Sequence, residues 1–482
     1  MNASSVHTPP TGESRRRRLI LAICCASIVV VVMDVSIVNV ALPDIRHDLR
    51  AAPSGLQWTV DAYALVLATF LVLSGSMADR FGRRRVFLVG LTIFGLGSLG
   101  CGLAPSIGWL IAARAAQGVG GTMLNPVALA IVADTFPEPS ERARAIGVFG
   151  SMSGLALALG PVLGGVLVDT LGWRSVFFVN VPIVVTAIVA SLRFVPESRA
   201  ERARRFDPVG QVLVAVLLGS VVYAVIEARS LGWGSPTILA LVAAAVTSLV
   251  GLVRYESRRV EPLLEMRLFR SVPLSAAILM ALFALCAFQA FLFVTTLYLQ
   301  DVRGLSPLDA GLGLLPVGTL VLLLSPVAGR LVATRGPRRP LLISGGALTA
   351  AGVALLWLTP HTPLPAVVAM YLLVGVFLGL VNPPITNTAV SGMPRSMAGV
   401  AAALASSGRQ TGTTLGVAVA GAIISPALGQ GGVSFTTTAR SVWWLVVVLG
   451  VGLAVVAVAS TGARAERTAE RAAALFADVG SP

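Results

Sequence analysis

The chain has 482 residues, of which 56% are hydrophobic and only 12% are charged, and its mean hydropathy is +0.86. A soluble protein of this length needs far more charged surface, so the composition excludes a water-soluble fold and predicts an integral membrane protein. The net charge of +14 could suit a nucleic-acid partner, but the basic residues, all arginine, lie in short segments between apolar runs. We therefore expect the lipid bilayer, and no nucleic acid, as a partner.

The sequence offers no disulfide framework, metal site or cleaved leader. Its four cysteines lie inside apolar runs, where small-residue packing explains them. Its three histidines are scattered, so we expect no metal and no other cofactor. The apolar run that follows the arginines at 15–18 is too long for the core of a signal peptide, and we interpret it as the first span.

Apolar runs of about 20 residues, the length that a bilayer-crossing helix requires, predict an all-α membrane protein with fourteen transmembrane helices. They cover residues 19–42, 56–78, 86–104, 107–132, 145–168, 174–194, 209–228, 236–254, 273–299, 309–333, 339–359, 364–388, 399–425 and 440–461. An even number of spans places both termini on one side. Most arginines fall in the tails and loops of that side, which predicts cytoplasmic termini, and the tryptophans map to the opposite ends of the spans.

Ionisable side chains inside spans are functional candidates by default, because burying them is costly. The first span carries Asp34 within Met33-Asp-Val-Ser-Ile-Val-Asn-Val-Ala-Leu-Pro43, roughly 10–13 Å below its outer end. Asp61 in the second span, and Arg114 at the start of Arg-Ala-Ala-Gln-Gly-Val-Gly-Gly-Thr in the fourth, lie at similar depths. Burial disfavours a carboxylate's charge and a nearby arginine favours it, so this group could switch a proton. The alternatives are a permanent structural pair and, for Asp61, exposure to external water.

A basic connector between the second and third spans reads Gly75-Ser-Met-Ala-Asp-Arg-Phe-Gly-Arg-Arg-Arg85. Its glycines permit a sharp turn, and its acid can meet helix ends or opposite charges. The residues that make its turns or carry its charge are Gly75, Asp79, Arg80, Gly82, Arg83 and Arg84. A similar run, Gly329-Arg-Leu-Val-Ala-Thr-Arg-Gly-Pro-Arg-Arg, follows the tenth span with Ala333 in place of the acid, which indicates an internal repeat.

The fifth span contains Gly160-Pro-Val-Leu-Gly-Gly165. Glycines allow close helix packing and a proline kinks a helix, so Gly160, Pro161, Gly164 and Gly165 suit a helix that gates between two halves. Small-residue packing alone would explain the glycines equally well.

Polar side chains in other spans could line a substrate cavity, although such residues more often bond neighbouring helices. The candidates are Asn39, Gln117, Asn125, Gln289, Asn382, Asn387 and Arg409. For Arg409, pairing between helices is an equal alternative.

The connector closely resembles the loop 2–3 signature of the major facilitator superfamily of transporters, with Met77 in place of the usual leucine. This resemblance implies that the connector residues named above act in gating, as a cytoplasmic latch between the two halves. The runs around Asp34 and Arg114 resemble the span-1 and span-4 motifs of its fourteen-span drug:proton antiporters. Gly160–Gly165 reproduces the core of the antiporter motif, although Ala156 stands where another glycine is usual. The resemblance covers residues 19–461 and implies two pseudo-symmetric six-helix bundles with two inserted helices.

The implied division is a cytoplasmic tail at 1–18, an N-terminal bundle at 19–195, a linker with two extra helices at 196–271, a C-terminal bundle at 272–461 and a cytoplasmic tail at 462–482. A substrate site would lie between the bundles near mid-membrane.

The function that the resemblance implies is that of a multi-pass protein of the inner (cytoplasmic) cell membrane and not an enzyme. It would export hydrophobic, often cationic small molecules by alternating access, using inward proton flow as its energy source. A proton-coupled importer of the same fold is the nearest alternative. A non-transporting membrane sensor is the other, but a sensor would require a soluble signalling domain, and the tails of this chain are short.

Overall fold

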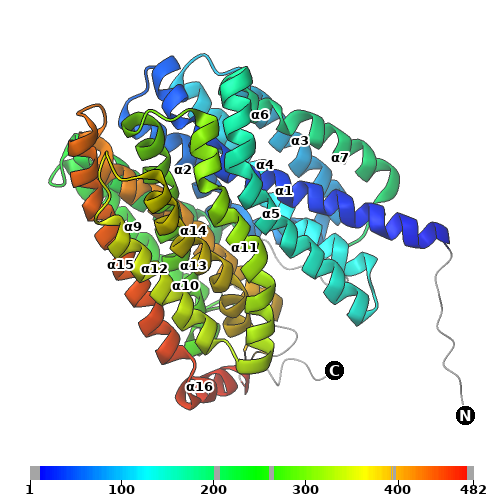
Figure 1. The fold of residues 1–482 in the computed structure, drawn as a ribbon. Helices are drawn as coiled ribbons and strands as arrows, with labels where there is room; N and C mark the ends of the chain where they lie inside the picture. Colours follow the sequence, from blue (N-terminus) through cyan, green and yellow to red (C-terminus); the bar gives the residue numbers. More distant parts are fainter. Residues whose placement is uncertain (1–10, 200–206, 260–264, 392, 394–397, 475–482) are drawn as a thin grey trace, which may run out of the picture.

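The computed structural model describes residues 11–199, 207–259, 265–391, 393 and 398–474, and this part of the chain is almost entirely helical, as predicted (Figure 1). In chain order the helices are α1 (Thr11–Asp48), α2 (Pro53–Phe81), α3 (Arg83–Gly102), α4 (Ile107–Thr135), α5 (Pro139–Leu171), α6 (Ser175–Phe178), α7 (Asn180–Phe194), α8 (Pro208–Leu231), α9 (Pro236–Glu256), α10 (Val272–Leu297), α11 (Pro307–Arg335), α12 (Arg338–Leu355), α13 (Leu364–Val390), α14 (Ala398–Ile424), α15 (Gly432–Ser460) and α16 (Ala463–Ala474). Three short turns of helix adjoin them, η1 (Met266–Arg270), η2 (Tyr298–Val302) and η3 (Ser425–Ala427).

The structure confirms the prediction of fourteen spans only in part. Within the described residues, ten helices are long and apolar enough to cross a membrane, or up to twelve if the bent helices α2 and α5 each count as one span. The helices α12 and α14, at the predicted spans 339–359 and 399–425, are not among them. α12 begins with two arginines, and both helices are rich in glycine and alanine, so their mean hydropathy is lower than that of their neighbours.

Three of the predicted spans are bent or interrupted. α2, at the predicted span 56–78, bends by 56° between Leu71 and Leu73. The predicted span 174–194 consists of α6 and α7, which meet at Val179. α5 bends by 42° between Leu157 and Leu159. Pro161 has no N–H to donate to the carbonyl four residues before it, which is that of Leu157, so the bend lies where the helical hydrogen bond is missing.

The helices form two bundles and a separate pair. We call α1–α7 the N-terminal half, α10–α15 the C-terminal half, and α8 with α9 the inserted pair. The helices of each half pack on one another, and α8 packs on α9, on α2 and on α14 (Figure 1). In the C-terminal half, Gly408, Gly412 and Gly416 bring α14 onto the backbone of α10: a Cβ at Gly412 would lie 2.3 Å from Leu282 O.

The two halves meet at one end of the molecule and diverge towards the other (Figure 1). They join where α1 ends at Asp48, through the helix pairs α1–α10, α2–α14 and α5–α11. We call this the Asp48 end, and the opposite end, where α1 begins, the Thr11 end. In the described residues, two side-chain hydrogen bonds join the halves directly. At the Asp48 end, Arg46 Nη1 donates to Asp301 Oδ2 at 3.4 Å, and Gln300 Nε2 donates to Val40 O at 2.9 Å.

Candidate functional site

A buried ion pair lies inside the N-terminal half. Arg114 of α4 donates from Nη1 to Asp34 Oδ2 of α1, and neither residue is exposed. The structure thus brings together two of the three residues that the sequence placed at a common depth. Because burying two charges is expensive, such a pair must be supported by further hydrogen bonds.

Amide and hydroxyl groups from three further positions supply this support. Gln117 Nε2 donates to Asp34 Oδ1 at 2.8 Å and to Ser98 Oγ at 2.8 Å, while Gln117 Oε1 accepts from Arg114 Nη1 at 2.7 Å. Asn180 Nδ2, at the start of α7, donates to Asp34 Oδ1 at 3.1 Å. We call these five residues, Asp34, Ser98, Arg114, Gln117 and Asn180, the Asp34 cluster. All five are fully buried.

The guanidinium of Arg114 is also fixed by α2 and α6. Arg114 Nε donates to Thr59 O at 3.0 Å. Its central carbon lies 4.4 Å from the centre of the Tyr63 ring and 5.8 Å from that of Phe177. A cation over an aromatic ring is stabilised when it is removed from water. The Asp34 cluster therefore ties together every helix of the N-terminal half except α5.

Close packing of α3 on α4 places Ser98 beside Gln117. A Cβ at Gly97 would lie 2.6 Å from Gln117 Cα, and a Cβ at Gly120 would lie 2.4 Å from Phe94 N. Only glycine permits these backbones to approach so closely, and the hydrogen bond from Gln117 to Ser98 depends on that approach.

The hydrogen-bonding capacity of the Asp34 cluster is not fully used. Arg114 Nη2, Asn180 Oδ1 and the nearby Tyr63 hydroxyl are buried atoms without a hydrogen-bond partner. A buried network that is partly satisfied is sensitive to a change in charge. If Asp34 took up a proton, Arg114 would lose its counter-charge, and its neighbours would have to rearrange. Asp34 has no contact with solvent in this conformation.

Asp61 does not join the Asp34 cluster. It is fully buried on α2, and neither of its carboxylate oxygens has a hydrogen-bond partner. Gln57 and Leu65 lie one helical turn before and after Asp61, on the same face of α2. Gln57 packs against Gly421 of α14, and Leu65 lines a cavity with residues of α8 and α14. The carboxylate is therefore on the α2 face that meets the other half and not on the face that meets Arg114. The alternative that Asp61 simply faces external water does not hold in this conformation.

The basic connector is bonded within the N-terminal half. Asp79 Oδ1 accepts from Arg83 Nη2 at 3.4 Å, and Arg83 also pairs with Asp134 at the end of α4. Arg84 Nη2 donates to Leu192 O at 3.0 Å. Gly75 and Arg80 are more open: nothing packs where a Cβ of Gly75 would stand, and the exposed Arg80 lies 5.8 Å from the Phe81 ring.

Gly82 ends α2 with a positive φ of 106°, a conformation that favours glycine. A Cβ at this position would meet Glu197 Oε1 at 2.5 Å. Glu197 also accepts from the backbone N–H of Arg84 at 3.1 Å and pairs with Arg85. The segment after α7 therefore closes over the turn of the connector.

The glycines of the fifth predicted span face two different partners. A Cβ at Gly160 would lie 2.0 Å from Ser36 of α1, and a Cβ at Gly164 would lie 2.8 Å from Ile37 of the same helix. A Cβ at Gly165 would lie 2.5 Å from Pro307 O of α11, and one at Gly311 of α11 would lie 2.3 Å from Pro161 O. The motif thus packs α5 on its own half and on the other half, next to the bend.

The cavity candidates lie in different environments. Gln117 belongs to the Asp34 cluster. Asn39 and Gln289 are buried, and each keeps one amide atom without a hydrogen-bond partner. Asn125, Asn382 and Arg409 are half-buried, and Arg409 Nη2 donates to Ser406 Oγ of its own helix at 2.5 Å, whereas Asn387 is exposed.

Three important residues around Asp34 were not among the predicted site residues. Asn180 is a polar residue within a predicted span, so the rule that selected Gln117 could have selected it. Ser98 and Tyr63 carry weaker signals, because hydroxyl groups are common in membrane helices and often bond to the backbone of the preceding turn.

Comparison with known proteins gives a consistent result. The family model described as Major Facilitator Superfamily matches residues 24–417. The chain is 40% identical over 393 residues to the multidrug resistance protein Stp of Mycobacterium tuberculosis, covering 82% of this chain and 73% of that protein. It is 37% identical over 430 residues to the tetracenomycin C resistance and export protein of Streptomyces glaucescens, covering 88% and 79%. A solved bacterial homolog of the human lysosomal transporter Spinster shares the fold, with a TM-score of 0.63 at 17% identity, covering 95% and 98%.

Proposed function

Because the chain belongs to the major facilitator superfamily, a family of membrane transporters, we propose that it exports hydrophobic small molecules in exchange for protons. The chain is a multi-pass membrane protein that acts as a transporter and not as an enzyme. Its relatives include proteins named for multidrug resistance and for the export of an antibiotic. These names support drugs, antibiotics or toxic metabolites as the class of substrate.

We further propose that fourteen helices cross the inner cell membrane with both termini in the cytoplasm. α12 and α14 would cross with the ten to twelve apolar helices, because each packs inside the C-terminal half. The arginine-rich Thr11 end would then face the cytoplasm, in accord with the positive-inside rule. Since the halves meet at the Asp48 end, this conformation would admit substrate from the cytoplasm, between the two bundles.

The observation that carries the proposed proton coupling is the buried Asp34–Arg114 pair. Protonation of Asp34 would remove one charge of the pair and leave Arg114 without its counter-ion, which costs several kcal/mol. α1, which carries Asp34, also carries Arg46 and Val40, the contacts that join the halves at the Asp48 end. A change at Asp34 would thereby bias that end towards opening.

Asp61 is the second proposed proton site. Its face of α2 meets α14, so opening of the Asp48 end would bring its unpaired carboxylate towards water outside the cell. A carboxylate that is desolvated in one state and hydrated in the other can couple a proton to the motion. The connector Gly75–Arg85 and the glycines of α5 would act as the moving contacts, with Asp79 released from Arg83 when the Thr11 end closes.

The proposal is tested by the variant Asp34→Asn in proteoliposomes with an imposed proton gradient. We expect uphill efflux of a fluorescent lipophilic cation to be abolished while binding of the same cation survives, since all the predicted substrate candidates except Gln117 lie outside the Asp34 cluster. The matched control is Asp309→Asn, which removes an exposed acid at the start of α11 and should export normally. Unchanged uphill export by Asp34→Asn, or inward transport by the unmodified protein, would reject the proposal.

A further inference from the structure

An apolar groove of about 460 Å³ runs between α1 and α7 near the Thr11 end. Its walls include Leu19 and Ala22 of α1, and Pro182, Thr186, Ala190 and Phe194 of α7. The single hydroxyl, that of Thr186, donates to the carbonyl of Pro182 and offers no free donor to the groove. The small side chains of its alanines leave the space of the groove open, and apart from the Thr186 hydroxyl its lining side chains are apolar.

The groove faces outwards. Leu19 and Ala22 at its edge are exposed, and Val185, Val189 and Leu192, on the same helix, are each more than half exposed. Exposed aliphatic side chains on an outer helix of a membrane protein lie against lipid chains. The groove is separate from the Asp34 cluster, none of whose residues lines it.

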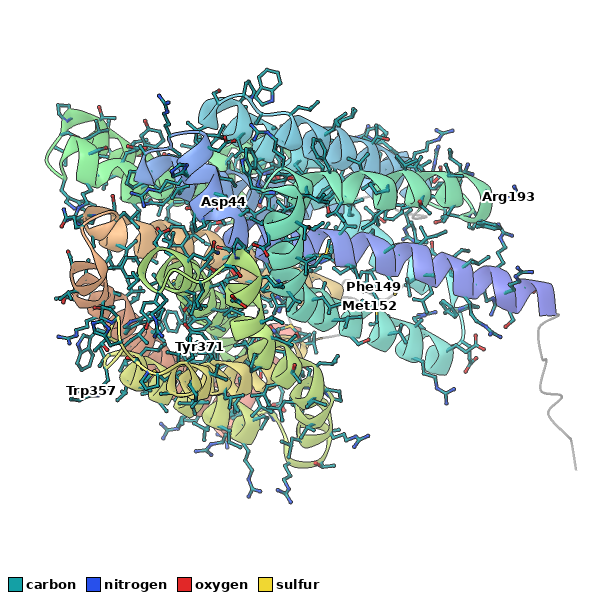
Figure 2. The ribbon with its side chains drawn as sticks, turned by 45° about the horizontal axis from the view of Figure 1, so that its top comes forward. Asp44, Phe149, Met152, Arg193, Trp357 and Tyr371 are labelled. Carbon is teal, nitrogen blue, oxygen red and sulfur yellow. The ribbon has the colours of Figure 1, made fainter. Side chains whose placement is uncertain are left out.

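Three arginines surround the end of the groove. Arg15 lies one turn before Leu19 on the same face of α1. Arg16 Nε donates to the carbonyl oxygen of Phe194 at 3.1 Å. Phe194 is the last lining residue of the groove at this end. Arg193 neighbours Phe194 on α7, and Figure 2 shows it at the same end of the molecule as the start of α1.

These arginines have no acidic partner among the residues that the structure describes. Within the described part of the chain, neither Arg15, Arg16 nor Arg193 forms an ion pair. The nearby acids are engaged elsewhere: Glu13 and Glu141 pair with Arg17, at 2.8 and 3.4 Å, and Glu197 pairs with Arg85 at 3.6 Å. Three positive charges that form no ion pair with a described residue therefore lie at the mouth of an apolar groove.

We propose that this groove is a binding site for one anionic phospholipid. One acyl chain lies along the groove, and the phosphate lies among Arg15, Arg16 and Arg193. The dimensions agree: Pro182 to Phe194 spans about 18 Å of helix at 1.5 Å per residue, against about 15 Å for the hydrocarbon of one leaflet. Basic pockets between membrane helices on the cytoplasmic side are suited to anionic lipid headgroups. The site does not depend on the transported substrate.

The test measures lipid retention by the purified full-length protein in detergent, using native mass spectrometry and titration with phosphatidylglycerol or phosphatidylcholine. We expect the protein to retain one phosphatidylglycerol and to prefer it over phosphatidylcholine. Arg15→Gln, Arg16→Gln and Arg193→Gln should each weaken phosphatidylglycerol binding by about fivefold, the equivalent of about 1 kcal/mol per arginine at a membrane surface. Arg193→Lys, which keeps the charge, should bind nearly as well as the unmodified protein.

A second set of variants tests the apolar part of the site. Ala22→Phe and Ala190→Phe fill the groove and should abolish retention of phosphatidylglycerol, while glycerol phosphate, which has no acyl chains, should not compete. Ala243→Phe on the exposed face of α9 is the matched control for the bulky ring, and Arg338→Gln at the start of α12 is the control for charge. Each variant's thermal unfolding midpoint in phosphatidylcholine shows whether it is folded. Equal retention of the two lipids, or retention unaffected by filling the groove, would overturn the proposal.

Discussion

Arg114 is the eighth residue of α4, and Tyr371 is the eighth residue of α13, which holds the same place in the order of helices of the C-terminal half. Arg114 pairs with Asp34 of α1. Tyr371 packs edge-on against Phe291 of α10, with ring centroids 5.1 Å apart, and Trp443 lies 6.4 Å from Phe291. The first and fourth helices of each half are thus joined by buried side chains, charged in one half and aromatic in the other.

The comparison indicates that the two halves have different roles. The Asp34 cluster contains a buried pair of opposite charges, and its hydrogen bonds depend on those charges. The aromatic cluster of Phe291, Tyr371 and Trp443 is stabilised by packing area and ring geometry, which do not depend on a proton at Asp34. We therefore expect the charge-dependent step in the N-terminal half, and we expect the C-terminal half to act as the more rigid partner.

The largest expected effect comes from removing half of the ion pair. Arg114→Leu leaves Asp34 buried without a cation and should cost about 3–5 kcal/mol of unfolding free energy. The double variant Asp34→Leu with Arg114→Leu buries no charge and should recover most of that loss. Its first and fourth helices would then be joined by uncharged side chains, as they are in the C-terminal half. Unfolding in a denaturing detergent measures both variants.

The outcome of this double-mutant cycle decides whether the pair is coupled. If the losses of the two single variants simply added in the double variant, Asp34 and Arg114 would act independently, and the contrast between the halves would fail. The double variant should fold but not export, because it retains no carboxylate at position 34.

The next largest effect comes from the aromatic cluster. Phe291→Ala removes a fully buried ring and should cost about 3 kcal/mol through the cavity that it leaves. The pH dependence of efflux should stay unchanged, because no titrating group is removed. Phe269→Ala, at a ring that is 39% exposed, is the control and should cost much less. A shift in the pH dependence of efflux for Phe291→Ala would contradict the assignment of the charge-dependent step to the N-terminal half.

The Asp34–Arg114 pair could be predicted because depth along a helix follows from counting residues. Rotation about the helix axis does not follow from such a count in a nearly all-apolar span. This is why the sequence could not show that Asp61 lies on the face of α2 that is turned towards α14. Asn180 was missed although it is a polar residue within a predicted span, and the break before it at Val179 had no strong sequence signal.

The repeat was visible in the sequence, but the difference between its copies needed the structure. Asp79 bonds to Arg83 in the first connector. The positions equivalent to these two residues in the second connector are Ala333 and Pro337, so the second copy lacks both partners. Arg338 and Arg339 there are exposed, and the described residues give them no ion pair. The turn itself is kept: Gly82 and Gly336 both have positive φ, 106° and 73°.

The smallest expected effect comes from these connectors. Asp79→Ala should cost less than about 1 kcal/mol, because the side chains of Asp79 and Arg83 are 31% and 16% exposed and Arg83 keeps Asp134 as a partner. Ala333→Asp should change stability still less, because Pro337 replaces the arginine that an acid there would meet. Unfolding measurements on both variants give the comparison. If Asp79→Ala slows efflux strongly while stability is unchanged, the pair acts in the motion between states; a loss above 2 kcal/mol would instead make it a structural clamp.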